Sequence, residues 1–175
     1  MKTGIETERL LLRRLTLEDV PLIQKYCHDR SLSKWIPVIP HPYTKKNARE
    51  FVVMAKKQWT KKTDYTYGIQ LDDLLVGCIG LHVKKHDAAE IGYWLGKEYR
   101  GQGIVPEAAH AVMTEAFKSL RLHRIYAKFL EGNNGSGRVM KKLGMQKEGV
   151  NRDADKVKNK YFNSITYSIL RNEFR

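Results

Sequence analysis

The chain has 175 residues, 42% of them hydrophobic, and carries 32 Lys and Arg against 19 Asp and Glu, a formal net charge of +13. This length predicts a single domain over residues 1–175, and the apolar content excludes a disordered or fibrous protein. No apolar run is long enough to cross a bilayer or to form a signal-peptide core, so we expect a cytoplasmic protein without a membrane partner.

The positive charge is compatible with an anionic cofactor, with an acidic partner such as RNA or the ribosome, or with solubility alone. Its lysines lie in scattered pairs, as at 56–57, 84–85 and 141–142, which is more typical of solvated faces than of a nucleic-acid-binding stripe. The two cysteines, Cys27 and Cys78, show neither a metal-binding spacing nor a disulfide framework. We expect both to be buried free thiols.

Hydrophobic periodicity and turn residues divide the rest of the chain into strands and helices. Pro37, Pro40 and Pro42 predict a loop over 31–43, and Asp72-Asp73 between two apolar runs predicts a hairpin. The predicted strands cover 9–15, 65–71, 74–83, 89–95, 124–129, 146–151 and 161–170, and the predicted helices cover 17–28, 44–59, 105–120 and 136–143. Because the early hairpins must be antiparallel, we expect an α+β fold, a mixed and mostly antiparallel sheet of about six to seven strands flanked by helices.

The most informative segment is 93–107, in which a strand, a glycine-bearing turn and a helix follow one another directly. The first backbone N–H groups of a helix have no partner within it, and the helix dipole favours an anion at that end. Glycines at 101 and 103 allow a close approach to the backbone. The turn therefore predicts a pyrophosphate site made by Arg100, Gly101, Gln102, Gly103, Ile104 and Val105.

The alternative is a structural strand-to-helix turn with a solvated arginine. A dinucleotide-binding fold fits poorly, because the third glycine of its motif would fall at Pro106. A Walker loop is excluded, because no Gly-Lys-Ser or Gly-Lys-Thr follows.

A second segment, 131–145, contains Asn133-x-x-Ser136 at the start of a short helix and ends in Lys-Leu-Gly-Met. Together with Arg100-x-x-Gly103, it resembles the GNAT N-acetyltransferase superfamily, whose members use acetyl-CoA. Segments 7–13 and 90–95, followed by Glu107-Ala108, are similar to the Rim-type (RimJ/RimL-like) ribosomal-protein N-alpha-acetyltransferase branch. The resemblance covers nearly the whole chain and implies the GNAT acyl-CoA N-acyltransferase fold.

The resemblance also implies roles for individual residues. The pyrophosphate of acetyl-CoA would bind the amides of residues 100–105, and the pantetheine arm would pair with the strand end at Tyr93, Trp94 and Leu95. Asn133 would hydrogen-bond the pantetheine, and Ser136 would lie near the thioester sulfur.

Two positions depart from the family pattern. The last motif position, commonly Gly or Ala, is Val105, and Pro106 after it has no N–H to offer a phosphate. A tyrosine that serves many members as general acid is replaced by Met140, which cannot donate a proton. Ser136 therefore inherits the acid role by default, although it could also be a helix N-cap.

Amide formation from a thioester requires deprotonation of the amine, stabilisation of the carbonyl oxygen and protonation of the thiolate. We expect direct attack in a ternary complex, with a backbone N–H near Tyr93 polarising the carbonyl. Glu90 is the best candidate for the base, acting through water; the alternative is an ordinary surface carboxylate. No metal site is predicted, and the loop with Trp35 and Tyr43 either selects the acceptor or simply packs.

The leading function is acetylation of a primary amine, most readily the N-terminal α-amine of a ribosomal or other protein. Two alternatives stay open: acetylation of a polyamine, an aminoglycoside or an amino-acid analogue, and a non-catalytic module that binds CoA or RNA. A homodimer and association with the ribosome are further expectations.

Overall fold

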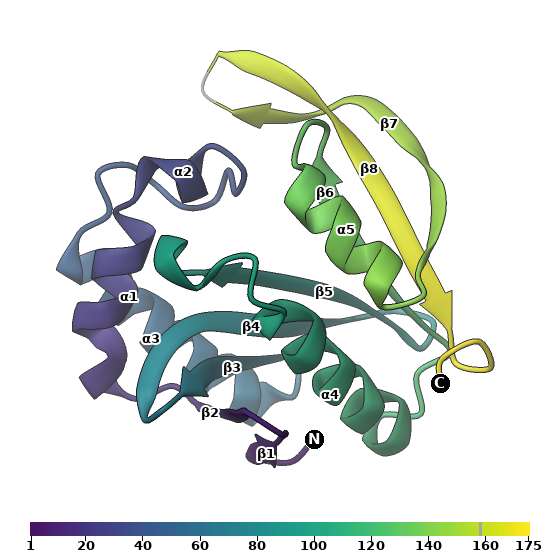
Figure 1. The fold of residues 1–175 in the computed structure, drawn as a ribbon, viewed down its shortest axis with the longest axis horizontal. Helices are drawn as coiled ribbons and strands as arrows, with labels where there is room; N and C mark the ends of the chain where they lie inside the picture. Colours follow the sequence, from purple (N-terminus) through teal and green to yellow (C-terminus); the bar gives the residue numbers. More distant parts are fainter. Residues whose placement is uncertain (158) are drawn as a thin grey trace.

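The computed structural model describes residues 1–157 and 159–175 (Figure 1). Its strands are β1 (Gly4–Glu6), β2 (Leu10–Arg14), β3 (Asp64–Leu71), β4 (Leu74–Lys84), β5 (Ala88–Leu95), β6 (Arg124–Leu130), β7 (Gln146–Val157) and β8 (Lys160–Leu170). Its helices are α1 (Val20–Cys27), α2 (Arg30–Ser33), α3 (Lys45–Lys61), α4 (Ile104–Ser119) and α5 (Asn134–Lys142), with 3-10 turns at Leu17–Asp19 and Lys97–Tyr99.

The strands of the described residues form one sheet of eight, in the order β1-β2-β3-β4-β5-β6-β8-β7. Neighbouring strands are antiparallel except β5 and β6, which run parallel. The predicted mixed, mostly antiparallel sheet is therefore confirmed. Its strand number is higher than expected because the short strand β1 pairs with β2.

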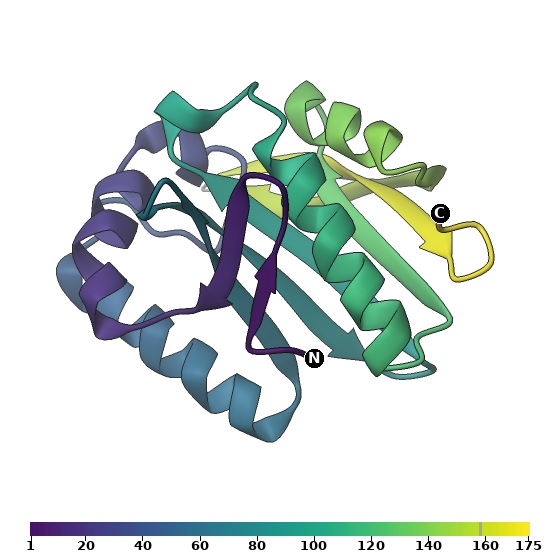
Figure 2. The same cartoon turned by 60° about the horizontal axis from the view of Figure 1, so that its bottom comes forward.

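Helices cover both faces of this sheet (Figures 1 and 2). Apolar side chains of α4 and α5 pack with those of the sheet on one face, in a core that includes Ile91, Val112 and Ile125. Helices α1 and α3 cover the other face, where Ile23 and Val52 pack against the sheet. The predicted amphipathic stripe of 105–120 is thus the buried face of α4.

Strands β5 and β6 are paired over only a short distance. Ala88 to Glu90 pair with Arg124 to Tyr126, and no further pairing of β5 with β6 occurs in the described residues. Strand β6 continues along β8 as far as the pair of Leu130 with Ser164. Between 91 and 95, β5 therefore has an edge that no strand covers, and this edge faces the cavity described below.

Several local predictions are confirmed. Asp72 and Asp73 both have left-handed φ angles, 46° and 62°, as a tight hairpin between β3 and β4 requires. Cys27 and Cys78 are buried free thiols. The proline-rich segment is not wholly a loop, because it begins with α2, whose N-cap Asp29 accepts a hydrogen bond from the Ser31 N–H at 2.9 Å.

In the part of the chain that the structure describes, no helix combines the length and the apolar character needed to cross a membrane.

Gly77 of β4 fixes how closely β5 can approach. A Cβ at this position would collide with the backbone oxygen of Trp94 and the side chain of Leu95. We expect Gly77→Ala to lower the free energy of unfolding by about 2 kcal/mol, the usual cost of overpacking, and to lower the melting temperature by about 4–8 °C. Gly149→Ala is the control, because a Cβ there meets open space. Equal melting temperatures of the two variants would contradict this account.

Candidate active site

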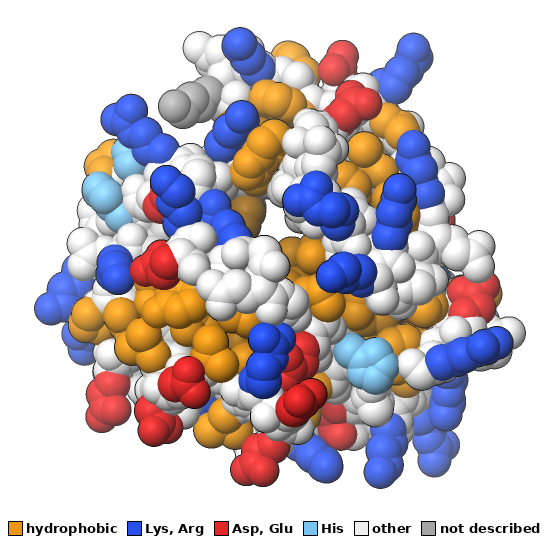
Figure 3. Space-filling view, viewed as in Figure 1, with side chains coloured by type: hydrophobic (Ala, Val, Ile, Leu, Met, Phe, Trp, Pro, Cys, Tyr) orange, Lys and Arg blue, Asp and Glu red, His pale blue; other side chains and the backbone are white. Residues whose placement is uncertain are grey.

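The divergence of β5 and β6 opens a cavity of about 740 Å³, within the range of small-molecule sites. Its walls come from the edge of β5, the start of α4, the start of α5, strand β6 and the loop after α2. Figure 3 shows the molecule hollowed here, with basic side chains around the hollow. Basic residues that line the cavity are Arg100, Lys128, Arg138 and Lys142.

The turn before α4 spans residues 100–105, and the Arg100 N–H, one of the amides predicted to bind phosphate, donates to the Lys97 carbonyl at 3.4 Å instead. Gly101 and Gly103 have φ angles of 81° and 78°, in the left-handed region that glycine adopts without strain. Gly103 is the N-cap of α4, so the amides that follow it are the first of the helix. The structure gives the N–H groups of residues 101–105 no backbone partner outside the helix among the described residues. They are available to an anion, and a Cβ at Gly101 would meet only open space.

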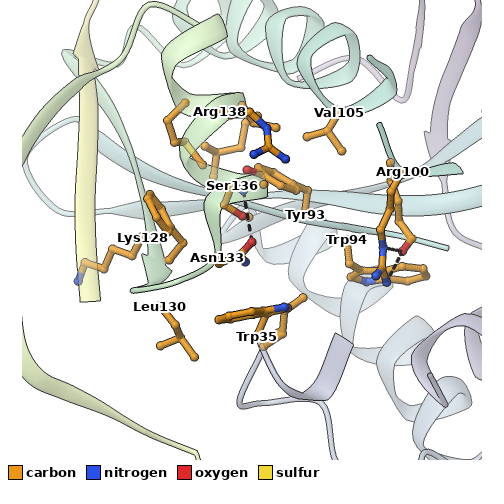
Figure 4. Close-up of a pocket in the computed structure, with 18 of the residues that line it drawn as sticks. Trp35, Tyr93, Trp94, Arg100, Val105, Lys128, Leu130, Asn133, Ser136 and Arg138 are labelled. Atoms are coloured by element: carbon orange, nitrogen blue, oxygen red, sulfur yellow. Dashed lines mark hydrogen bonds between the residues drawn. The ribbon is translucent and has the colours of Figure 1, made fainter. Parts of the chain in front are cut away.

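Contrary to the expectation from the sequence, the Arg100 side chain does not lie beside these amides. Its Nε and Nη2 donate to the Leu95 carbonyl at 3.3 and 3.2 Å, and its Nη1 donates to the Ser31 hydroxyl at 2.8 Å. It lies 3.8 Å from the Asp29 carboxylate. Figure 4 shows Arg100 with its hydrogen bonds to the end of β5. Through Ser31 the guanidinium also reaches α2, and backbone amides remain as the principal donors of the turn.

A carboxylate in the first turn of α4 connects the start of this helix to the segment between β1 and β2 by hydrogen bonds. Glu107 accepts hydrogen bonds from the Thr7 hydroxyl at 2.6 Å, the Arg9 N–H at 3.0 Å and Arg9 Nε at 2.7 Å. Arg9 also donates to the Gln102 carbonyl at 3.1 Å. Burial alone would raise the pKa of Glu107, but the hydrogen bonds from Thr7 and Arg9 outweigh it, so the pKa lies below its usual value.

A group with a lowered pKa stabilises the fold above its unfolded pKa and loses that contribution as the pH falls. We expect Glu107→Gln to lower the free energy of unfolding by about 1.5 kcal/mol near neutral pH, discounted because Arg9 is partly exposed. The difference from the unmodified protein should shrink as the pH falls below the ordinary carboxylate pKa of about 4.3, because the unfolded chain then binds a proton more readily than folded Glu107, whose pKa is lowered. Urea unfolding at several pH values measures this, and a pH-independent difference would contradict it.

Tyr93, Trp94 and Leu95, the residues predicted to pair with the pantetheine arm, all line the cavity. Trp94 also packs under the Tyr26 ring in the second core, at a centroid distance of 6.4 Å. Tyr93 lies on the α4 face, packed against the main core. Because no strand in the described part of the chain covers this edge of β5 between residues 91 and 95, its backbone groups can pair with an extended molecule.

Helix α5 begins two residues earlier than predicted, at Asn134 rather than Ser136. Asn133 is the N-cap, and its side-chain oxygen accepts a hydrogen bond from the Ser136 N–H at 3.3 Å. Ser136 is therefore not the N-cap, and its hydroxyl is left to point into the cavity (Figure 4). Both residues line the cavity, but the capping bond already uses the Asn133 oxygen, which leaves its NH₂ group to donate to a ligand.

Glu90 is the last residue of β5 that pairs with β6, so it lies where the two strands separate. Its carboxylate accepts a hydrogen bond from the Tyr126 hydroxyl at 3.3 Å and lies 3.6 Å from the Lys84 ammonium. It lines the cavity and is partly exposed. The structure therefore brings Glu90 and Ser136 into one cavity, on different walls.

Two further polar residues, Asp155 and Ser164, line the cavity, and no motif in the sequence pointed to them. Opposite Asn163 of β8, strand β7 carries three residues, 152–154, and a bulge of this kind redirects the side chains next to it. The Asn163 side chain holds the bulge by accepting from the Asp153 N–H at 2.9 Å, and it donates to Glu131 at 2.8 Å. The Ser164 hydroxyl is buried and makes no hydrogen bond in the described part of the chain.

The two aromatic residues proposed for acceptor choice have different positions. Trp35 lines the cavity and lies against Gly132, which has a left-handed φ of 91° where a Cβ would come within 3.4 Å of the ring. The loop after α2 therefore reaches across to the turn between β6 and α5. Tyr43 is buried in the second core, which agrees with the alternative interpretation that it packs rather than selects the acceptor. Among the described residues, no group of three potential ligands could hold a metal ion.

Comparison with known proteins identifies the family of the chain. A family model described as an acetyltransferase (GNAT) domain matches residues 9–146. The chain is 31% identical over 172 residues to the N-acetyltransferase p20 of Bacillus licheniformis, with 96% of each chain covered. A GNAT-family acetyltransferase structure from Bacillus anthracis is 30% identical, with a TM-score of 0.87 and coverage of 97% of this chain and 99% of that one.

The fold is also that of RimL, a ribosomal L7/L12 alpha-N-protein acetyltransferase whose structure was solved with coenzyme A. RimL is 21% identical, with a TM-score of 0.88 and coverage of 95% of this chain and 97% of RimL. The family match spans most of this chain, including the turn at 100–105 and the Asn133-Ser136 segment. The chain therefore belongs to the GNAT family and is an N-acetyltransferase.

Proposed function

We propose that the protein transfers the acetyl group of acetyl-CoA to the α-amine at a protein N-terminus, with ribosomal proteins as the first candidates. The observation that carries this proposal is that an anion-binding turn and an unpaired strand edge open into the same cavity. Unpaired amides at 101–105 suit the pyrophosphate, and the edge of β5 suits the amide-containing pantetheine arm. RimL, which shares the fold, was solved with coenzyme A.

The residues of the cavity supply what the reaction needs. Glu90 would take a proton from the amine through water, and a backbone N–H of β5 near Tyr93 would stabilise the developing oxyanion. Ser136, at the start of α5, would donate to the sulfur side. Because a thiolate leaves readily, this arrangement requires no covalent intermediate with the protein.

The charges of the cavity favour an acceptor with a single positive charge. Glu90 and Asp155 can attract one ammonium group, whereas Arg100, Lys128, Arg138 and Lys142 would repel an extended polycation. A protein N-terminus meets both conditions, and RimL is itself named for an N-terminal protein acceptor. A polyamine or an aminoglycoside fits these charges less well.

Thiol release from acetyl-CoA, together with mass spectrometry of the acceptor, tests the proposal. We expect turnover with peptides that carry the N-terminal sequences of ribosomal proteins. The same peptides with a blocked N-terminus but an internal lysine should not react. Turnover with polyamines alone would assign the small-molecule function, and no thiol release with any amine would contradict acetyl transfer by this protein.

A further inference from the structure

The Tyr93 hydroxyl is an unexplained polar group inside the cavity. The hydroxyl is buried and forms no hydrogen bond of normal geometry within the described residues. Tyr93 nevertheless lines the cavity, so a ligand there can reach it. Buried hydroxyl groups are nearly always paired, and an unpaired one in a native structure is a sign of a missing partner or of a catalytic role. A ligand in the cavity is the natural candidate for that partner.

The position of Tyr93 indicates which part of a ligand it would meet. The residue lies in the middle of the unpaired edge of β5, two residues from Leu95 near the anion-binding turn and three from Glu90 at the closed end. An extended arm that starts at the turn and runs along this edge advances about 3.3 Å for each residue it passes. The reacting carbon must lie within reach of Glu90, so the sulfur bonded to it lies on the stretch of this edge between Glu90 and the turn, where Tyr93 stands, an argument that rests on the proposed function.

Ser136, at the start of α5, lies next to Tyr93 of β5 in the cavity (Figure 4). Burial raises the pKa of Tyr93 to about 12, and interaction with the Ser136 hydroxyl offsets part of the rise. A thiol such as that of cysteine has a pKa of about 8.5. Transfer of a proton from this phenol to a thiolate is therefore strongly unfavourable, whereas donation of a hydrogen bond to the thiolate costs no proton.

We propose that the Tyr93 hydroxyl donates a hydrogen bond to the sulfur of coenzyme A as the carbon–sulfur bond breaks, with Ser136 holding the phenol in place. The amine nitrogen forms a bond to the acetyl carbon, the carbon–sulfur pair leaves on sulfur, and the nitrogen loses one proton to Glu90 through water. The thiolate takes up one proton to become the free thiol after release, which balances the proton lost by the nitrogen. Tyr93 keeps its own proton throughout and supplies from β5 the donor that Met140 of α5 lacks.

The variant Tyr93→Phe removes only the hydroxyl. We expect it to lower kcat by about tenfold to 100-fold, the range for one hydrogen bond to a charged group, with little change in the KM for acetyl-CoA. Tyr26→Phe is the matched control, because the Tyr26 hydroxyl is also buried without a hydrogen bond in the described residues but lies outside the cavity. An unchanged kcat in Tyr93→Phe would overturn the proposal.

A second measurement separates this role from a structural one. The thiolate absorbance of bound coenzyme A, followed from about pH 6 to about pH 9.5, gives the pKa of its thiol. We expect this pKa to be higher in Tyr93→Phe than in the unmodified protein, while Arg138 and Lys142 remain in both. Desulfo-coenzyme A, which has no sulfur, should bind both proteins equally. An equal thiol pKa, or a loss of desulfo-coenzyme A affinity, would show that Tyr93 acts through structure.

The proposed function and this inference fail in different ways. If the unmodified protein does not bind coenzyme A or acetylates no amine, the function is wrong. If it does both, and Tyr93→Phe matches it in kcat and in the pKa of the bound thiol, only the role of Tyr93 is wrong.

Discussion

Replacement of Glu90 by glutamine is expected to lower kcat for acetylation of a peptide α-amine by about 100-fold near neutral pH. The amine reaches the cavity mainly as an ammonium ion, because its pKa is about 7.7–8.0, and it must lose a proton before or during attack. Glu90 is the carboxylate at the closed end of the cavity, where β5 leaves β6. Glutamine preserves the size of the side chain but cannot accept a proton.

The pH dependence of this loss identifies its cause. Above about pH 8 the free amine is already abundant, so a missing base should matter less and the rates of Glu90→Gln and the unmodified protein should converge. Glu6→Gln is a control, since Glu6 is a strand carboxylate that does not line the cavity. A reduction of less than about tenfold, or a loss equal at all pH values, would remove Glu90 from the role of base.

Asp155 is the competing carboxylate, and the two can be separated in the same assay. Its place on the hairpin of β7 and β8, away from the start of β6, suits attraction of the ammonium group rather than proton transfer. Asp155→Asn should therefore raise the KM for the peptide more than it lowers kcat. The reverse result, with kcat lost in Asp155→Asn and kept in Glu90→Gln, would exchange the two roles.

Features that depend on neighbouring residues were accessible from the sequence. The apolar repeat of 105–120 encodes α4, and the paired aspartates at 72 and 73 encode a turn, because both are decided within a few residues. The turn at 100–105 is of the same kind, since two glycines and the following helix are enough to expose its amides. The placement of Tyr93 and Glu90 on opposite faces of β5 follows from strand alternation alone.

Features that depend on distant pairing were not accessible. Asp155 enters the cavity because β7 bulges against β8, and a shift in register leaves no mark on the local pattern. The Arg100 guanidinium turns away from the amides because Ser31 of α2 and the Leu95 carbonyl attract it. Ser136 lost its predicted role as N-cap because Asn133 offers the same hydrogen bond one turn earlier.

Gly103→Val is expected to weaken the binding of coenzyme A by about 30- to 100-fold, the second large effect that the structure predicts. Gly103 has a φ of 78°, and valine, which is β-branched, is strongly disfavoured there. To relieve the strain, the turn must rotate the amides of residues 103–105 away from their common direction. Loss of one or two hydrogen bonds to a charged phosphate amounts to about 2–3 kcal/mol.

Isothermal titration with coenzyme A and with acetyl-CoA measures this loss, and Gly149→Val is the matched control. Gly149 has no left-handed φ, and a Cβ there meets open space, so the same substitution should leave affinity unchanged. Because acetyl-CoA and coenzyme A share the pyrophosphate, Gly103→Val should weaken both equally, whereas a defect near the sulfur would separate them. Unchanged affinity in folded Gly103→Val would place the phosphates elsewhere, and absence of heat with the unmodified protein would remove the donor site altogether.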